Sequence, residues 1–318
     1  MRVFKNIIFI IILCIGILGM SEVTQLVLQN NENYVQTRNK SYYAIQKEKK
    51  NSIDVITVGD SLSYSSISPM ELWENYGITS FVCGQSGQNI QEMYYMLKNV
   101  FKTQSPKMVI LETNVFFKEQ SITTETKQTV EEWAKYNIPL IGEHDVWKSL
   151  ITGKEYTEES YKGFSFRCNI DSYKKGEYMK ETNSKETIPK VTLFYMNKII
   201  KLCNEHNAEI ILFSAPSPQN YNYSKHNSIS DYANKQNLKY INMNLKVSEI
   251  GINWKTDSLD KGDHLNYLGA RKVTAYLGKY LNENYNLEDH RGDSDYSSWE
   301  MLKQEYDKKA LQYIKQMK

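Results

Sequence analysis

The sequence predicts an α/β protein in which helices cover both faces of a mostly parallel, five-stranded sheet, with a membrane-spanning helix at the N-terminus. Short β-branched runs alternate with helical patterns, which is the order of elements in a parallel sheet. A run of 14 apolar residues lies close to the first residue. The 318 residues allow one enlarged domain or two small ones.

The composition narrows the class of protein. Hydrophobic residues make up 41% and charged residues 24% of the chain, which favours a sizeable buried core and excludes disordered and low-complexity classes. The 39 Lys and Arg against 37 Asp and Glu leave a net charge of +2. We therefore expect no nucleic-acid partner, because such binding depends on a positive surface.

The N-terminal apolar run has the character of an anchor. Arg2 and Lys5 precede the run Ile7–Met20, and the apolar character extends to Leu28. The shorter run alone suits the core of a signal peptide, whereas 22 residues up to Leu28 would cross roughly 30 Å of hydrocarbon. Few small residues flank Met20 as a cleavage site, so we favour an uncleaved anchor over residues 1–28. The positive-inside rule then places the remainder outside the cytoplasm, attached to the cell membrane by a single pass.

The cysteines indicate a fold that does not depend on bridges. Cys14 lies in the apolar run, and the other three are Cys83, Cys168 and Cys203. No CxxC pair or His/Cys cluster occurs, so we expect neither a metal nor a dissociable cofactor.

After a polar linker at 29–50, the alternating pattern begins. Strands are predicted at 53–59, 79–83, 108–112, 209–213 and 239–242. Helices are predicted at 69–76, 89–103, 190–207, 228–236 and 268–285. We expect residues 51–285 to form the main domain.

Two segments lie outside the alternation. Residues 115–188 separate the third and fourth strands, too long a stretch for a structureless loop. We expect a helix at 129–136 within a partly helical insertion, which either caps the carboxyl edge of the sheet or packs as an appendage. Aromatic residues occur throughout it, among them Tyr156, Tyr161, Phe164, Phe166, Tyr173 and Tyr178. The tail, residues 286–318, has helical spacing at 299–316 and is expected to form a peripheral helix.

The strongest chemical signal follows the first strand, where the chain reads Gly59-Asp60-Ser61-Leu62. A serine at the carboxyl edge of an open α/β sheet lies where ligand crevices form. Either Ser61 or Asp60 could instead cap the helix that follows.

This motif resembles the first block of the SGNH, or GDSL-type, hydrolase superfamily, which implies a three-layer, flavodoxin-like fold. In VCGQSGQNI, Gly87 fits the second-block glycine and Gly84 is the alternate. In VILETN, Asn114 fits the third-block asparagine, although Glu112-Thr113 stands where the family usually has glycine. In LDKGDHLNYLGARK, His264 fits the fourth block. The resemblance covers residues 53–114 and 190–285.

The expected roles follow from acyl chemistry. Ser61 would attack a carbonyl, with His264 as the base that removes and later returns its proton. The backbone N–H groups of Ser61 and Gly87 and the side chain of Asn114 would stabilise the oxyanion. Both Gly84 and Gly87 also suit ordinary turns, and Asn114 suits a loop. The other four histidines lack a comparable setting and are expected at the surface.

A carboxylate must also orient the His264 ring. The family commonly places it three residues earlier, but Lys261 occupies that position. Asp260 lies four residues before the histidine and Asp263 immediately before it. We favour Asp260 and keep Asp263 as the alternative, because adjacent side chains usually diverge.

A GDSL-type domain on an N-terminal anchor resembles the group that contains DltD-like and peptidoglycan O-acetyltransferase B-like proteins. That resemblance implies acetyl or D-alanyl transfer, or ester hydrolysis, on peptidoglycan or teichoic acid beside a membrane-bound O-acyltransferase. The aromatic insertion could then supply a groove on which sugars stack. Two alternatives stay open: a catalytically silent, glycan-binding scaffold, and a secreted lipase or thioesterase.

Overall fold

The computed structural model describes residues 2–119, 121–156 and 160–316. The chain divides into two compact units. The first combines Met1–Lys47 with Gln120–Glu158, and the second combines Glu48–Glu119 with Glu159–Lys318. The expected insertion is therefore split, because its first half belongs to the unit that holds the N-terminal helix.

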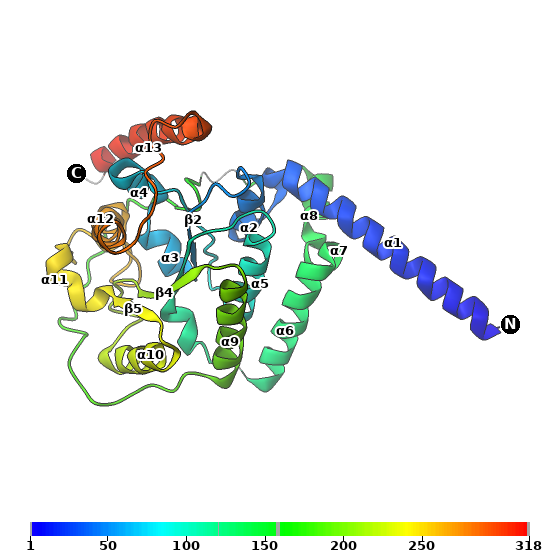
Figure 1. Cartoon of the computed structure of the whole chain (residues 1–318), viewed down its shortest axis with the longest axis horizontal. Helices are drawn as coiled ribbons and strands as arrows, with labels where there is room; N and C mark the ends of the chain where they lie inside the picture. Colours follow the sequence, from blue (N-terminus) through cyan, green and yellow to red (C-terminus); the bar gives the residue numbers. More distant parts are fainter. Residues whose placement is uncertain (1, 120, 157–159, 317–318) are drawn as a thin grey trace. The chain divides into compact units, whose positions relative to one another are not determined.

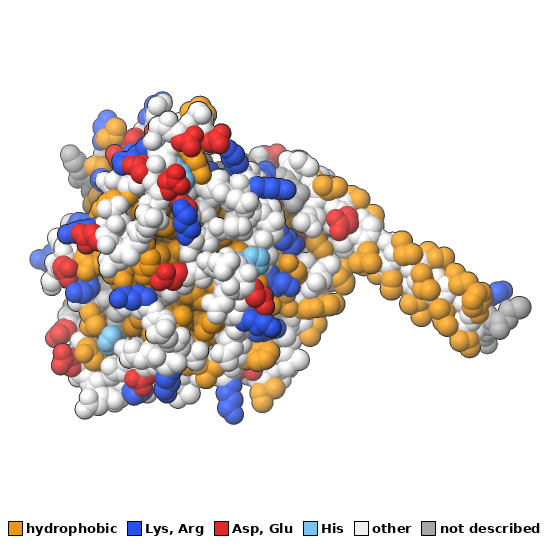
Figure 2. Space-filling view, in the orientation of Figure 1, with side chains coloured by type: hydrophobic (Ala, Val, Ile, Leu, Met, Phe, Trp, Pro, Cys, Tyr) orange, Lys and Arg blue, Asp and Glu red, His pale blue; other side chains and the backbone are white. Residues whose placement is uncertain are grey.

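The first unit is helical. Helix α1 (Arg2–Asn30, blue in Figure 1) contains the span Val3–Leu28, which is apolar and long enough to cross a membrane. Its most apolar stretch is not buried by the rest of the chain, whereas Ser21, Thr24 and Leu28 near its end are buried. Figure 2 shows hydrophobic side chains along the length of the helix on the face in view. The same length and composition also suit a signal sequence. Beyond α1 come η1 (Glu32–Tyr34), η2 (Thr37–Asn39), α2 (Lys40–Ala44) and η3 (Ile45–Lys47), and later α6 (Ile122–Asn137), α7 (Pro139–Gly142) and α8 (His144–Thr152).

A small core shows that the predicted linker is folded. Leu28, Val35, Tyr43 and Val146 are buried against one another, so α2 and α8 pack beside the end of α1. The helix expected at 129–136 begins earlier, at Ile122. The Ser121 side chain accepts a hydrogen bond from Thr124 N–H and so caps it.

The second unit contains the five predicted strands: β1 (Val55–Val58), β2 (Ser80–Val82), β3 (Met108–Glu112), β4 (Glu209–Ser214) and β5 (Lys239–Asn242). All are parallel, in the order β2-β1-β3-β4-β5, which is the flavodoxin-like order. β1 to β3 are buried on both faces, which explains their continuous apolar runs. The order reverses between β1 and β3, and ligands of such sheets bind at the carboxyl ends of these strands.

Helices cover the sheet in two groups (Figure 1). One group packs α12 (Tyr267–Asn284) against α3 (Ser61–Ser66) and α4 (Pro69–Tyr76). The other packs α5 (Ile90–Val100) against α9 (Lys190–Glu205), and α10 (Tyr223–Gln236) lies on β5. α10 begins five residues before its predicted start because the Asn222 side chain accepts from Lys225 N–H at 2.8 Å and caps the helix. The remaining elements are η4 (Thr113–Phe117), η5 (Met243–Lys246), α11 (Val247–Ile250), η6 (Ser294–Tyr296) and α13 (Ser297–Gln316).

The second half of the insertion, from residue 160 onward, packs largely without helix or strand. It passes the end of β2, where Val82 N–H donates to the Lys162 carbonyl at 2.9 Å. Gly163 follows with φ +88°, and a Cβ there would lie 1.9 Å from the Val82 carbonyl oxygen. Only glycine fits this crossing.

Three insertion aromatics pack against the tail instead of lining a groove. The rings of Tyr161, Phe164 and Phe166 lie 5.4, 6.4 and 4.7 Å from that of Tyr306 in α13. Tyr306 is completely buried, and the ring of Trp299 in the same helix packs at a tilt against that of Trp73 in α4, with centroids 5.2 Å apart. The tail helix is therefore part of the core of this unit.

The surface assignment was wrong for His290. It is 8% exposed, and its Nε2 lies 2.7 Å from Asp54 Oδ2. Its ring stacks on Tyr296 at 4.2 Å. The contact with Asp54 attaches the chain after α12 to the start of β1. Local sequence patterns do not predict such a long-range contact.

We predict that Tyr306→Phe lowers the free energy of unfolding by about 1–3 kcal/mol. The Tyr306 hydroxyl bonds to Glu71 Oε1 at 3.1 Å and to Ser68 Oγ at 2.9 Å, and both are buried. Urea denaturation of the full chain in detergent micelles measures the change. Tyr313→Phe is the control, because Tyr313 stacks on Phe166 through its ring. Equal losses in the two variants would contradict the importance of the hydroxyl.

Candidate active site

The site begins where β1 ends. Close packing requires a glycine at position 59, because a Cβ there would lie 2.4 Å from the Cβ of Glu112. The Asp60 side chain accepts from Leu62 N–H at 3.1 Å and so caps α3. Ser61 is the first residue of α3, which leaves its hydroxyl available and its backbone N–H without an acceptor inside the helix. Of the two residues that could cap this helix, Asp60 is therefore the one that does so.

The structure brings together three of the expected residues. His264 Nε2 lies 2.7 Å from Ser61 Oγ, and His264 Nδ1 lies 2.7 Å from Asp260 Oδ2. The imidazole is 14% exposed and the Asp260 side chain 41%. A neutral ring protonated on Nδ1 would donate to Asp260 and present the Nε2 lone pair to the serine hydroxyl. This is the geometry that general-base activation of a serine requires.

The loop before α12 determines which aspartate faces the ring. Lys261 and Gly262 both have positive φ, +59° and +88°, so the chain turns back on itself. The turn lets Asp260 Oδ1 accept from His264 N–H at 2.6 Å while Oδ2 accepts from the ring. Asp263 Oδ2 is 3.7 Å from Nδ1, beyond hydrogen-bond distance, and its Oδ1 accepts from Asn220 at 2.6 Å. Asp260, four residues before the histidine, therefore makes the contact.

The two glycines after β2 have different surroundings. A Cβ at Gly84 would lie 2.2 Å from Ser63 Oγ, so Gly84 is packed against α3. Gly87 is exposed with φ +63°, and a Cβ there would meet no atom within 4 Å. The close packing of Gly84 explains why glycine is needed there, and the Gly87 N–H remains a proposed oxyanion donor.

Asn114 lies in η4, directly after β3. Its Nδ2 donates to Asp60 Oδ2 at 2.8 Å, and the second hydrogen of the same amide can donate elsewhere. The same carboxylate oxygen lies 3.0 Å from Lys118 Nζ, which also donates to the Gln88 carbonyl at 2.7 Å. Asp60 thereby connects the first-block segment to η4 and to the loop after β2.

Sequence reasoning missed Lys118 and the polar segment after β4. Ser217 Oγ donates to the Asp263 carbonyl at 2.6 Å, and Asn220 bonds to the Asp263 side chain, so this segment braces the histidine loop. The sequence could have indicated this segment by its position, because its polar residues follow a parallel strand and so lie at the same sheet edge as Ser61. Lys118 carried no such signal.

A buried acid lies under the site. Glu112 is completely buried at the end of β3, with Tyr221 Oη at 2.5 Å from its Oε1 and Asn114 N–H at 3.0 Å from its Oε2. Burial, followed by the nearby Asp60 carboxylate, raises the pKa of Glu112 from 4.5 to about 8. Protonated Glu112 can donate to the Tyr221 oxygen, which can then donate to Thr113 Oγ1 at 2.9 Å. Glu112-Thr113, the departure from the family pattern, thus forms part of a buried network.

Asp260, Asp263 and His264 also have spacing that could hold a metal ion. Both ring nitrogens of His264 are already engaged, by Asp260 and by Ser61. Ligation of a metal by the ring would therefore break one of these two hydrogen bonds. The donor set fits a proton relay better than a cation site.

The fold and the site together define a class: a parallel α/β protein with a serine–histidine–aspartate arrangement at the carboxyl edge of its sheet. No family model matches the chain, and no curated protein matches it. Solved structures do resemble it. A protein from Desulfitobacterium hafniense assigned as lipolytic and of the G-D-S-L family is 13% identical with a TM-score of 0.40, covering 71% of this chain and 98% of its own.

Two more structures are similar. An assigned acylhydrolase from Bacteroides fragilis is 12% identical with a TM-score of 0.40, covering 78% of this chain and 96% of its own. A GDSL-like lipase from Bacteroides thetaiotaomicron is 12% identical with a TM-score of 0.36, covering 80% and 95%. At this level of similarity, neither the activity nor the substrates of those proteins transfer to this chain.

Proposed function

We propose that this chain is a serine esterase or O-acyltransferase of the SGNH type. The observation that carries the proposal is the continuous relay from Ser61 Oγ through the His264 ring to Asp260, with both contacts at 2.7 Å. The residues come from the end of β1 and from the loop before α12, and Ser61 and His264 are 203 positions apart in the sequence. Such convergence at the ligand-binding edge of the sheet favours a catalytic role over three separate structural roles.

In the proposed reaction, Ser61 Oγ attacks the carbonyl carbon of an ester while its proton passes to His264 Nε2. The tetrahedral oxyanion accepts hydrogen bonds from Ser61 N–H, Gly87 N–H and the Asn114 amide. It collapses by breaking the bond to the alcohol, which leaves with the proton from His264, and an acyl-serine ester remains. Water or a second hydroxyl then attacks this ester, again with His264 as base, and restores Ser61.

We further propose that the protein acts outside the cytoplasm on cell-envelope glycopolymers and carries an acetyl or D-alanyl group. An uncleaved α1 would hold the second unit at the membrane surface, where such polymers are made. A membrane-bound O-acyltransferase would be its source of acyl groups. Transfer and hydrolysis share the same acyl-enzyme and differ only in the second nucleophile.

The test is covalent labelling of the full chain in detergent micelles with a fluorophosphonate, followed by intact-mass measurement. We expect one adduct on the wild type and none on Ser61→Ala. Ser65→Ala is the matched control, because Ser65 lies one turn further along α3 and donates to the Ser61 carbonyl at 2.7 Å; it should keep the adduct. No adduct on the folded wild type would contradict the proposal and favour a silent scaffold.

A further inference from the structure

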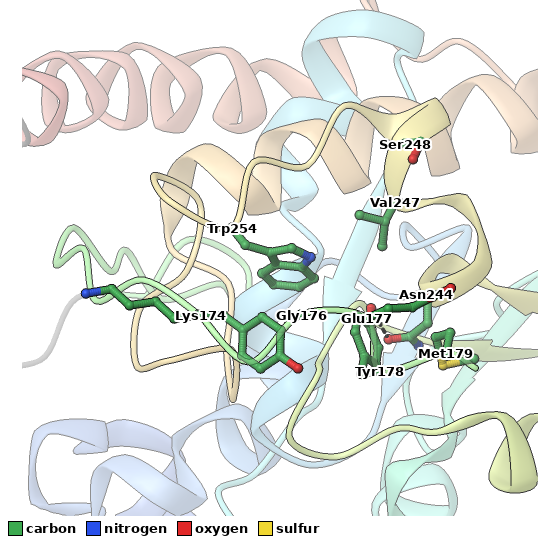
Figure 3. Close-up of a pocket in the computed structure, with 10 residues that line it drawn as sticks. Lys174, Gly176, Glu177, Tyr178, Met179, Asn244, Val247, Ser248 and Trp254 are labelled. Carbon is green, nitrogen blue, oxygen red and sulfur yellow. Dashed lines mark hydrogen bonds between the residues drawn. The ribbon is translucent and has the colours of Figure 1, made fainter.

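A pocket of about 510 Å³ lies beside the loop that carries Asp260 and His264. Tyr173, Tyr178 and Trp254 contribute three aromatic rings to its wall, arranged edge to face with centroids 6.0–6.2 Å apart. In Figure 3, Trp254, Tyr178 and Val247 border the same open space. The volume lies in the range of roughly 300–1,000 Å³ that is typical of small-molecule sites.

Backbone hydrogen bonds join the segment that bears Tyr173 to the triad loop, which is the loop that carries Asp260 and His264. Asp171 N–H donates to the Ser258 carbonyl at 3.0 Å, and Lys261 N–H donates to the Asp171 carbonyl at 2.9 Å. Two residues further on, Tyr173 N–H donates to the Trp254 carbonyl at 3.2 Å. The segment that bears Tyr173 is thus fastened along the loop that bears Asp260.

Direct packing brings the two sites still closer. A Cβ on Gly262 would lie 2.9 Å from Tyr173 Cδ2, so the backbone of the triad loop touches this ring. Gly262 precedes His264 by two residues, a span of at most about 7 Å of extended chain. A ligand held in the pocket therefore lies next to the loop that positions the catalytic ring.

The aromatic wall is held in place before any ligand binds. The Tyr178 hydroxyl donates at 3.0 Å to Oδ1 of Asn244, which is buried and also accepts from Ser217 N–H at 2.9 Å. The side-chain oxygen and amide of Asn244 are both already hydrogen-bonded within the chain. Polar atoms for a ligand are instead supplied at the rim by exposed residues: Lys174, Glu177 and Ser248.

We propose that this pocket holds a hexose ring of the carbohydrate whose ester is formed or cleaved at Ser61, an inference that rests on the proposed function. A hexose presents apolar C–H faces, which suit aromatic rings, and a belt of hydroxyls, which suits a rim of ammonium, carboxylate and hydroxyl groups. A fatty acyl chain would call for an aliphatic lining. Only Val247 and the buried Met179 supply such groups among the lining residues described.

The structure thereby reassigns the expected sugar-stacking groove. Tyr173 and Tyr178 come from the insertion, as the sequence suggested, but Tyr161, Phe164 and Phe166 pack against the tail. The third ring, Trp254, belongs to the segment before the triad loop and joins the others only in the folded chain.

The test is isothermal titration of the full chain in detergent micelles with two uncharged trisaccharides, one of glucose and one of N-acetylglucosamine. We expect the wild type to bind at least one of them and Trp254→Leu to weaken that binding by about tenfold or more. A leucine keeps the site apolar but removes the flat face. Trp254→Phe keeps an aromatic face and should stay within about threefold of the wild type.

Trp133→Leu is the matched control, because Trp133 is 51% exposed on α6, in the other unit; it should bind as the wild type does. Circular dichroism checks that each variant is folded. No binding of either trisaccharide by the wild type would overturn the proposal. Trp254→Leu binding as tightly as the wild type would overturn it too, as would saturable hexanoate binding that Trp254→Leu preserves.

Fluorophosphonate labelling of the same samples separates the two proposals. Labelling of Ser61 without sugar binding would overturn the pocket proposal alone. Sugar binding that depends on Trp254, without labelling, would support the pocket and contradict the serine chemistry.

Discussion

Asp260→Asn is expected to lower kcat for p-nitrophenyl acetate hydrolysis by about 10³–10⁴-fold. Asp260 accepts two hydrogen bonds, from His264 N–H and from the ring nitrogen Nδ1. An asparagine can accept only one of them through its oxygen. If that oxygen stays on the backbone N–H, its amide donates to Nδ1 and the ring proton moves to Nε2, the atom that must accept from Ser61.

Asp263→Asn is the matched control, one residue from His264 and equally exposed. Its nearer oxygen is 3.7 Å from Nδ1, and its hydrogen bond runs to Asn220. We expect kcat to change by less than about tenfold, which corresponds to roughly 1.4 kcal/mol. The rate of phosphonylation of Ser61 should follow the same order. A larger loss in Asp263→Asn than in Asp260→Asn would show that Asp263 orients the ring.

The second large effect concerns the dependence of stability on pH. The pKa of Glu112 is about 8 in the folded chain because the carboxyl is buried beside the Asp60 carboxylate, whereas its ordinary value is 4.5. Between these values, the native state keeps a proton that the unfolded state has lost. This contribution to stability is complete below pH 4.5 and is lost as the pH rises to 8.

Between pH 5 and pH 8.5, we expect the free energy of unfolding of the wild type to fall by on the order of 4 kcal/mol more than that of Glu112→Gln, at about 1.4 kcal/mol for each pH unit between the two pKa values. Glutamine can accept from Asn114 N–H with its oxygen and donate to the Tyr221 oxygen with its amide, as a protonated carboxyl at position 112 could. Urea unfolding at pH 5 and pH 8.5 measures the difference. Glu283→Gln, on the exposed face of α12, is the control and should follow the wild type. Parallel curves for wild type and Glu112→Gln would refute a protonated Glu112.

The sequence determined the fold class because its evidence was local. Continuous β-branched runs and turn signals mark strands that are buried on both faces, and all five strands begin and end within two residues of their predicted positions. The parallel α/β fold was confirmed. Helix boundaries were less accurate where side-chain caps at Ser121 and Asn222 start helices ahead of their apolar pattern.

The sequence alone also placed Ser61 and His264 as candidates, because a motif at a strand end and a histidine before a capped helix are short-range signals. It could only rank Asp260 above Asp263. That contact depends on two consecutive positive φ values at Lys261 and Gly262, and on Asn220, which lies 43 residues before Asp263 and donates a hydrogen bond to its side chain.

Tertiary structure alone decided the contacts between distant segments. The burial of Tyr306 in the aromatic cluster, the raised pKa of Glu112 and the contact of Trp254 with Tyr173 and Tyr178 each require groups from separate parts of the chain. Hydrophobic pattern specifies that a residue is buried, but not against which partner. Partners are fixed by packing of the whole chain, because burial and hydrogen bonding depend on every neighbouring atom at once.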